Sequence, residues 1–109
     1  MLNKILSQDT IVAPITPIGG SVCVIRISGS GSLRVLRSVF DSKVRDFESH
    51  RVYYGWIVDK VKEQVIDEVL VTVMLAPKSF TMEDVVEIGC HGGVKSAEAV
   101  LALIEFWSV

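Results

Sequence analysis

Residues 51–75 read RVYYGWIVDKVKEQVIDEVLVTVML, and this stretch decides the fold class. It contains two runs rich in β-branched and aromatic residues, Arg51–Val58 and Gln64–Leu75, on either side of the charged segment Asp59–Glu63. β-Branched and aromatic side chains pack well on a pleated surface, and two such runs around a short polar turn are typical of a hairpin. The stretch therefore predicts two antiparallel strands.

Three further strands and two helices are predicted on either side of this hairpin. Upstream, Thr10–Thr16 and Val22–Ser28 are apolar runs around a turn, and downstream Asp84–Gly89 is a short apolar run. Leu33–Phe40 and Gly93–Trp107 instead repeat their apolar residues at helical spacing. Because the strands outnumber the helices and do not alternate strictly with them, we expect an α+β fold. Its sheet is mixed or mostly antiparallel, with about five strands and two to three helices.

The composition describes one small folded domain, residues 1–109. Half of the residues are apolar, including 18 Val and ten Ile, which excludes a disordered chain and favours a sheet-rich core. The formal charge of −2 gives no general attraction to phosphate backbones, so a self-sufficient nucleic-acid binder is not expected. No apolar run is long enough for a membrane helix, and Met1–Thr10 lacks the apolar centre of a signal peptide. We therefore expect a location in the cytoplasm, or in an organelle matrix, and no membrane association.

Several motifs of catalytic and metal chemistry are missing from the sequence. It holds no G-x-x-x-x-G-K-[ST] phosphate loop, no C-x-x-C pair and no H-E-x-x-H segment. Cys23, His50, Cys90 and His91 match no zinc-binding spacing. Neighbours on a strand point to opposite faces, so Cys90 and His91 make a poor nucleophile–base pair. We interpret both cysteines as buried and reduced, with His91 in a turn.

Two charged residues lie inside apolar strands. Arg26 shares a strand face with Val22 and Val24, and Glu87 follows Val85–Val86. An unpaired buried ion is costly, so each residue needs a partner. One interpretation is structural: the two residues pair with each other or lie at a wet sheet edge. The other is functional: they bind a polar ligand that offers acceptors to Arg26 and an amidine-like pair of donors to Glu87.

Four blocks of sequence and two hairpin segments form a pattern that covers nearly the whole chain. The blocks are DTIVA at residues 9–13, IRISG at 25–29, SFTMEDVVEI at 79–88 and CHGG at 90–93, and the hairpin segments are ESHRVYYG at 48–55 and VIDE at 65–68. In this order and spacing, from about residue 9 to residue 104, they resemble the N-terminal domain of the MnmE/TrmE family of tRNA modification GTPases. The paired glycines of the CHGG block also let a ligand or another backbone segment approach closely.

The resemblance implies a fold and a ligand. The family's N-terminal domain is similar to the tetrahydrofolate-binding fold of the glycine-cleavage aminomethyltransferases, dimerises, and holds a 5-formyl-tetrahydrofolate-type cofactor near the dimer interface. Arg26 and Glu87 match the family's folate-contacting arginine and glutamate. They are the expected cofactor-binding residues, and no catalytic or metal-binding residue is expected in this chain.

The resemblance also implies a larger assembly. The complete proteins of the family add a helical domain and a potassium-dependent GTPase domain that binds GTP and magnesium. With a flavin-dependent partner they modify carbon 5 of the wobble uridine of certain tRNAs. None of the residues 1–109 matches the helical domain, the phosphate loop, the C-terminal cysteine motif or a further folate-contacting lysine of the family.

The sequence departs from the family pattern at two places. The turn Pro17–Ser21 is shorter than the family's glycine loop, and Met82 stands where glycine is common. We expect a homodimeric, folate-binding module that by itself neither hydrolyses GTP nor modifies tRNA. Two alternatives stay open: a purely structural dimerisation module without a ligand, and a stand-alone folate-dependent one-carbon transferase.

Overall fold

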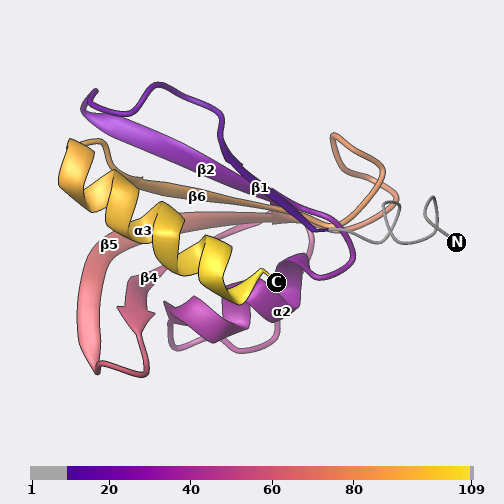
Figure 1. The fold of residues 1–109 in the computed structure, drawn as a ribbon. Coiled ribbons are helices and arrows are strands. Elements are labelled where there is room, and N and C mark those ends of the chain that lie inside the picture. The colour runs from indigo at the N-terminus through magenta and orange to yellow at the C-terminus, as the bar shows by residue number, and fades with distance from the viewer. Residues whose placement is uncertain (1–9, 109) are drawn as a thin grey trace, which may run out of the picture.

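The computed structural model of the protein describes residues 10–108 and has the expected α+β fold, with two helices on one face of a six-stranded sheet (Figure 1). Asp9 of the first family block, and most of the Met1–Thr10 segment, lie outside the described residues. The elements are β1 (Ile11–Pro14), β2 (Val22–Ser28), α2 (Ser32–Val39), β3 (Phe40–Asp41), β4 (Arg51–Asp59), β5 (Gln64–Met74), β6 (Val85–His91) and α3 (Val94–Trp107). Neither of these helices has the length and apolar content needed to cross a membrane.

The sheet is antiparallel throughout, in the order β1-β2-β6-β5-β4-β3. The hairpin over residues 51–75 is confirmed as β4 and β5, and the other three predicted strands are confirmed as β1, β2 and β6. The expected count of about five strands was one too low, because β3 has only two residues, Phe40 and Asp41. So short a strand has no readable alternation, and Phe40 also fits the apolar spacing of the preceding helix.

The end of β6 requires a second correction. Cys90 and His91 are the last two residues of the strand and not part of a turn. They pair with Cys23 and Val22 of β2, which extends the ladder to the glycines. The two side chains do point to opposite faces, as expected for strand neighbours, since Cys90 is buried and His91 is exposed.

One face of the sheet and the two helices enclose the hydrophobic core. Alternate residues of the central strands point to this face, as a period of two requires, and both helices contribute one buried stripe. Within this core, the side chains that are at most 3% exposed are Cys23, Ile25, Ile27, Val35, Leu36, Val39, Ile57, Val69, Val71, Val73, Val86, Ile88, Cys90, Ala97, Val100 and Ile104. Burial of one Val, Leu or Ile side chain contributes about 1.5–3 kcal/mol, so this layer is the main source of stability.

The opposite face of the sheet, here called the open face, carries no helix among the described residues. It presents Val22, Val24, Arg26 and Ser28 of β2, Glu87, Gly89 and His91 of β6, Leu70 and Thr72 of β5, and Val52, Tyr54 and Trp56 of β4. Val22, Val52 and Leu70 are 58%, 61% and 54% exposed. Contiguous exposed apolar side chains of this kind mark an interaction site more often than a free surface.

Two glycine turns pack directly against each other where β6 passes into α3. The Gly92 N–H donates to the Ser21 carbonyl at 3.1 Å, and the Gly19 N–H donates to the Gly92 carbonyl at 2.8 Å. A Cβ atom on Gly92 would lie 1.9 Å from the Gly20 carbonyl oxygen. The close approach that the CHGG block permits is therefore made by backbone from the Pro17–Ser21 turn.

Substitution of Gly55 should test how tightly β3 covers β4. A Cβ atom at Gly55 would lie 2.3 Å from the Asp41 carbonyl oxygen and 2.7 Å from the Phe40 ring, so Gly55→Ala should lower the free energy of unfolding by about 2–3 kcal/mol. The matched control is Gly89→Ala, where the new Cβ atom would meet only the Leu70 carbonyl oxygen at 3.5 Å. Urea unfolding of both variants gives the comparison, and equal stabilities would contradict the packing at Gly55.

Candidate functional site

Arg26 and Glu87 lie side by side on two adjacent inner strands of the sheet. They are direct cross-strand partners in the antiparallel pairing of β2 with β6. Arg26 donates from Nε and from Nη2 to Glu87 Oε2, at 2.9 Å and 2.6 Å. Since β2 and β6 are inner strands, neither residue lies at a sheet edge. Of the arrangements considered from sequence, the two residues make the mutual pair, and they make it on the open face.

The pair is only partly shielded from water. The Arg26 side chain is 29% exposed and that of Glu87 is 19% exposed. Both hydrogen bonds end on one carboxylate oxygen, and within residues 10–108 no hydrogen bond reaches Glu87 Oε1. The guanidinium also has N–H groups beyond the two that Glu87 accepts. The pair therefore retains donors and an acceptor with which a ligand could bond.

A groove of about 380 Å³, the open-face groove, lies along β6 on the same face of the sheet; neither Arg26 nor Glu87 lines it. Gly89 lies between Glu87 and His91 on the same face of the strand, and its missing side chain leaves the floor flat. The lining residues are Ser21, Val22, Tyr54, Glu68, Val69, Leu70, Gly89, Cys90 and His91. Most of them are apolar at the surface of the groove, so a flat and partly apolar group would fit it.

His91 is fixed by a contact that the sequence patterns did not reveal. The Asp67 carboxylate accepts the His91 backbone N–H at 2.8 Å, and its other oxygen lies 2.6 Å from His91 Nδ1. The Asp67 side chain is 8% exposed, whereas that of His91 is 65% exposed at the end of the open-face groove. The VIDE and CHGG blocks supply the two residues, so the contact joins segments already singled out by sequence.

A second polar contact lies on the other side of the open-face groove. Tyr54 donates its hydroxyl hydrogen to Glu68 Oε2, and this hydrogen bond to a carboxylate raises the pKa of Tyr54. The Tyr54 ring also packs edge-on against Trp56, with 5.2 Å between the ring centroids. The rings of Tyr54 and Trp56 are therefore both exposed on the β4 side of the open face.

The cysteines belong to the core, as predicted. Cys23 and Cys90 are cross-strand partners on the helix-covered face, and the Cys90 thiol lies 3.2 Å from the Cys23 carbonyl oxygen, to which it donates. Burial raises the pKa of Cys90 to about 12. His50 and His91 are both exposed, away from the two buried thiols. No group of three or more His, Cys, Asp or Glu side chains that could hold a metal ion occurs in the described part of the chain.

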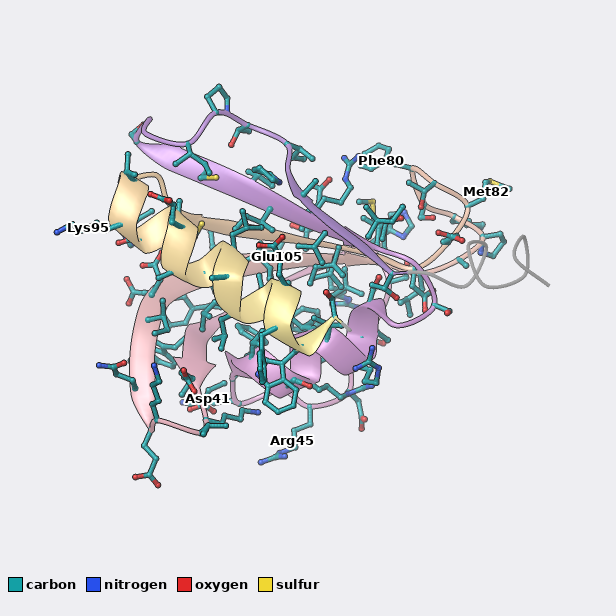
Figure 2. The ribbon with its side chains drawn as sticks, in the orientation of Figure 1. Asp41, Arg45, Phe80, Met82, Lys95 and Glu105 are labelled. Carbon is teal, nitrogen blue, oxygen red and sulfur yellow. The ribbon has the colours of Figure 1, made fainter. Side chains whose placement is uncertain are left out.

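The loop between β5 and β6 extends past one end of the sheet and carries two exposed apolar side chains, Phe80 and Met82 (Figures 1 and 2). The Phe80 ring lies against Arg26, with the guanidinium carbon 5.2 Å from the ring centroid. Met82 is 70% exposed and has a φ of 66°, in the left-handed region that favours glycine. This backbone shape suits glycine, the residue that the resemblance leads one to expect where Met82 stands.

The fold and the site together define a class of protein: a two-layer α+β domain whose helices cover one sheet face and whose other face carries a charged pair and a groove. The chain belongs to the family described as GTP-binding protein TrmE N-terminus, whose model matches residues 10–106.

Curated proteins with the name tRNA modification GTPase MnmE match over almost the whole chain. The protein of Carboxydothermus hydrogenoformans is 48% identical over 107 residues, which cover 91% of this chain and 23% of that protein. Those of Geobacillus kaustophilus and Lactobacillus delbrueckii subsp. bulgaricus are 46% and 43% identical, and cover 88% and 95% of this chain and 22% and 23% of their own length. The chain thus spans somewhat less than a quarter of the length of these relatives.

Thiol labelling should report the burial of the cysteines. Because the pKa of Cys90 is raised to about 12, its thiolate is scarce at pH 8, and the thiolate is the nucleophile. Cys23 is fully buried. We expect neither cysteine to react with a thiol-specific reagent in the native protein at pH 8, and both to react once urea has unfolded it. Rapid labelling of either residue without denaturant would contradict the core position.

Two substitutions of Met82 should measure the cost of its backbone conformation. Met82→Gly and Met82→Ala remove the same exposed side chain, but only glycine adopts a positive φ without strain. We expect the glycine variant to be more stable than the alanine variant by about 1 kcal/mol, from urea unfolding. Equal free energies of unfolding would show that the positive φ at residue 82 does not destabilise the alanine variant.

Proposed function

We propose that this chain is the folate-binding and dimerising part of a tRNA modification GTPase. The observation that carries the proposal is the Arg26–Glu87 pair at the centre of the open face, on the same face as a groove with a flat floor. The two residues that match the family's folate-contacting positions are also the charged pair of that face.

The chemistry of a 5-formyl-tetrahydrofolate suits this arrangement. Its pterin ring offers an N–H and an amino group side by side, and Glu87 Oε1, which accepts no hydrogen bond within residues 10–108, can accept from these donors. Its carbonyl, formyl and carboxylate oxygens are acceptors for the remaining N–H groups of Arg26. The floor at Gly89 gives a flat ring room to lie on the sheet. Strands also hold such groups more rigidly than loops do.

The rest of the open face supports pairing with a second copy of the chain. Val22, Val52, Leu70 and Tyr54 are each more than half exposed on this one surface. A small domain buries a limited share of its surface, and covering these side chains would remove more apolar area from water. We propose that the homodimer forms through the open face, so that the folate lies near the interface.

This chain covers less than a quarter of the length of its relatives. The activity of the complete protein is therefore a proposal, which rests on those relatives. Their name, tRNA modification GTPase, assigns them a GTPase activity and a role in tRNA modification. We propose that GTP, magnesium and potassium act at a GTPase domain outside residues 1–109, and that a flavin-dependent partner and tRNA join the complete protein. We expect this to take place in the cytoplasm.

A second candidate function is favoured by one contact. Arg26 and Glu87 bond directly to each other, which is also what a purely structural dimerisation module would show. In that case the pair would stabilise the pairing of β2 with β6 and would bind nothing. Ligand-dependent thermal melts separate the two functions.

Glu87→Ala is the decisive variant. We expect 5-formyl-tetrahydrofolate to raise the melting temperature of the wild-type protein by several degrees, as a ligand that binds only the native state does. In Glu87→Ala this rise should be almost lost, since truncation of one side of a charged contact costs about 2–5 kcal/mol. The control is Glu98→Ala, which removes one carboxylate from the exposed surface of α3 and should keep the full rise.

Two outcomes would reject the folate site. An equal rise in wild type and Glu87→Ala would place the ligand elsewhere. No rise in wild type, together with a lower melting temperature for Glu87→Ala than for Glu98→Ala, would identify the structural module instead.

Leu70→Lys should test the proposed dimer interface. Leu70 is 54% exposed at the centre of β5, so lysine is tolerated in the monomer but would place an unpaired charge in an open-face interface. We expect at least about a tenfold weaker dimer by sedimentation at tens of micromolar protein. Ala99→Lys, on the exposed side of α3, is the control and should leave the dimer intact. A monomeric wild-type protein, or equal effects of both variants, would reject this interface.

A further inference from the structure

We infer that Phe80 is a positioning residue for Arg26: its ring holds the guanidinium in place on the open face, so that the N–H groups not used by Glu87 are ready for a ligand's acceptors. This inference rests on the proposed folate site, because the orientation of Arg26 matters for binding only if Arg26 contacts the ligand. It concerns a residue outside the strands that form the site.

The contact of Glu87 alone does not fix the guanidinium. Arg26 Nε and Nη2 both donate to the same oxygen, Glu87 Oε2. A fork of two parallel bonds to two oxygens would hold the two planar groups in one orientation, whereas a single shared oxygen leaves the guanidinium plane able to turn about it. A second support is therefore needed if Arg26 is to keep one orientation.

The ring of Phe80 provides that support. Its centroid lies 5.2 Å from the Arg26 guanidinium carbon, within the range of a cation–π contact. Phe80 is nevertheless 69% exposed, so burial in the core does not account for its place. Figure 2 shows it on the loop between β5 and β6, away from both helices. Among residues 10–108, the cation–π contact with Arg26 is the specific interaction found for this side chain.

The loop holds Phe80 there through hydrogen bonds to fixed parts of the fold. The Thr81 hydroxyl lies 2.8 Å from that of Ser28, two residues after Arg26 on the same strand face. At the ends of the loop, the Ala76 N–H donates to Asp84 Oδ1 at 2.9 Å, and the Ser32 hydroxyl donates to the Asp84 carbonyl at 2.9 Å. The residue next to Phe80 is thus tied beside Arg26, which places the ring over the guanidinium.

The test compares Phe80→Leu, which removes the ring, with Phe80→Tyr, which keeps it. Two quantities are measured: the affinity for 5-formyl-tetrahydrofolate by calorimetry, and the exchange rate of the Arg26 Nε–H by NMR in the ligand-free protein. We expect Phe80→Leu to weaken binding by about 3–10-fold and to speed the exchange by a similar factor, and Phe80→Tyr to stay within about twofold of wild type in both. Melting temperatures should hardly change, since Phe80 is mostly exposed.

The outcomes separate this inference from the proposed function. If wild type does not bind the folate, the proposed function fails, and the exchange rates still decide whether Phe80 positions Arg26. If Phe80→Leu weakens binding but leaves the Arg26 exchange rate unchanged, Phe80 contacts the ligand itself and the inference is overturned. Unchanged affinity in Phe80→Leu also overturns it, as does an equal loss in Phe80→Tyr.

Discussion

The antiparallel pairing of β2 with β6 is the constraint on which the rest of this structure depends. Its register places Cys23 opposite Cys90 and Arg26 opposite Glu87, one pair on each face of the sheet. A shift of β2 by one residue would turn Arg26 into the helix-covered core and Cys23 toward the open face. The same register therefore fixes the core and the candidate site at once.

The two faces of the sheet differ in what they contribute to the stability of the fold. The helix-covered face is filled by Val, Ile and Leu side chains whose burial stabilises the fold. The open face keeps exposed apolar side chains around a partly hydrated ion pair, an arrangement that adds little to the stability of an isolated domain. Exposed apolar patches of this kind mark interaction sites in other proteins, and the proposed ligand and dimer sites both lie on this face.

The surroundings of the ion pair show how a strand-borne site is completed by loops. β2 and β6 supply the charges, while the loop after β5 supplies Phe80 and the turn after β6 packs against the Pro17–Ser21 turn. The left-handed backbone at Met82 belongs to the same loop. This loop therefore carries both the left-handed position, at Met82, and the aromatic contact with Arg26, at Phe80, and both side chains are exposed.

The sequence by itself determined the elements and the unusual residues. Apolar alternation predicted β2, β4, β5 and β6, helical spacing predicted α2 and α3, and two charges inside apolar strands marked Arg26 and Glu87. These properties are local, since each follows from residues within one strand or helix. The two-residue strand β3 escaped prediction because it is too short to show a period.

Only the tertiary structure decided which residues meet. Three contacts show this: Arg26 with Glu87, Asp67 with His91, and Phe80 with Arg26. Each joins residues that are 24 to 61 positions apart in the sequence. Local patterns carry no record of strand order or register, and these two choices are made by the packing of the whole sheet against its helices. The sequence could name the charged residues, and the fold alone placed them on the open face.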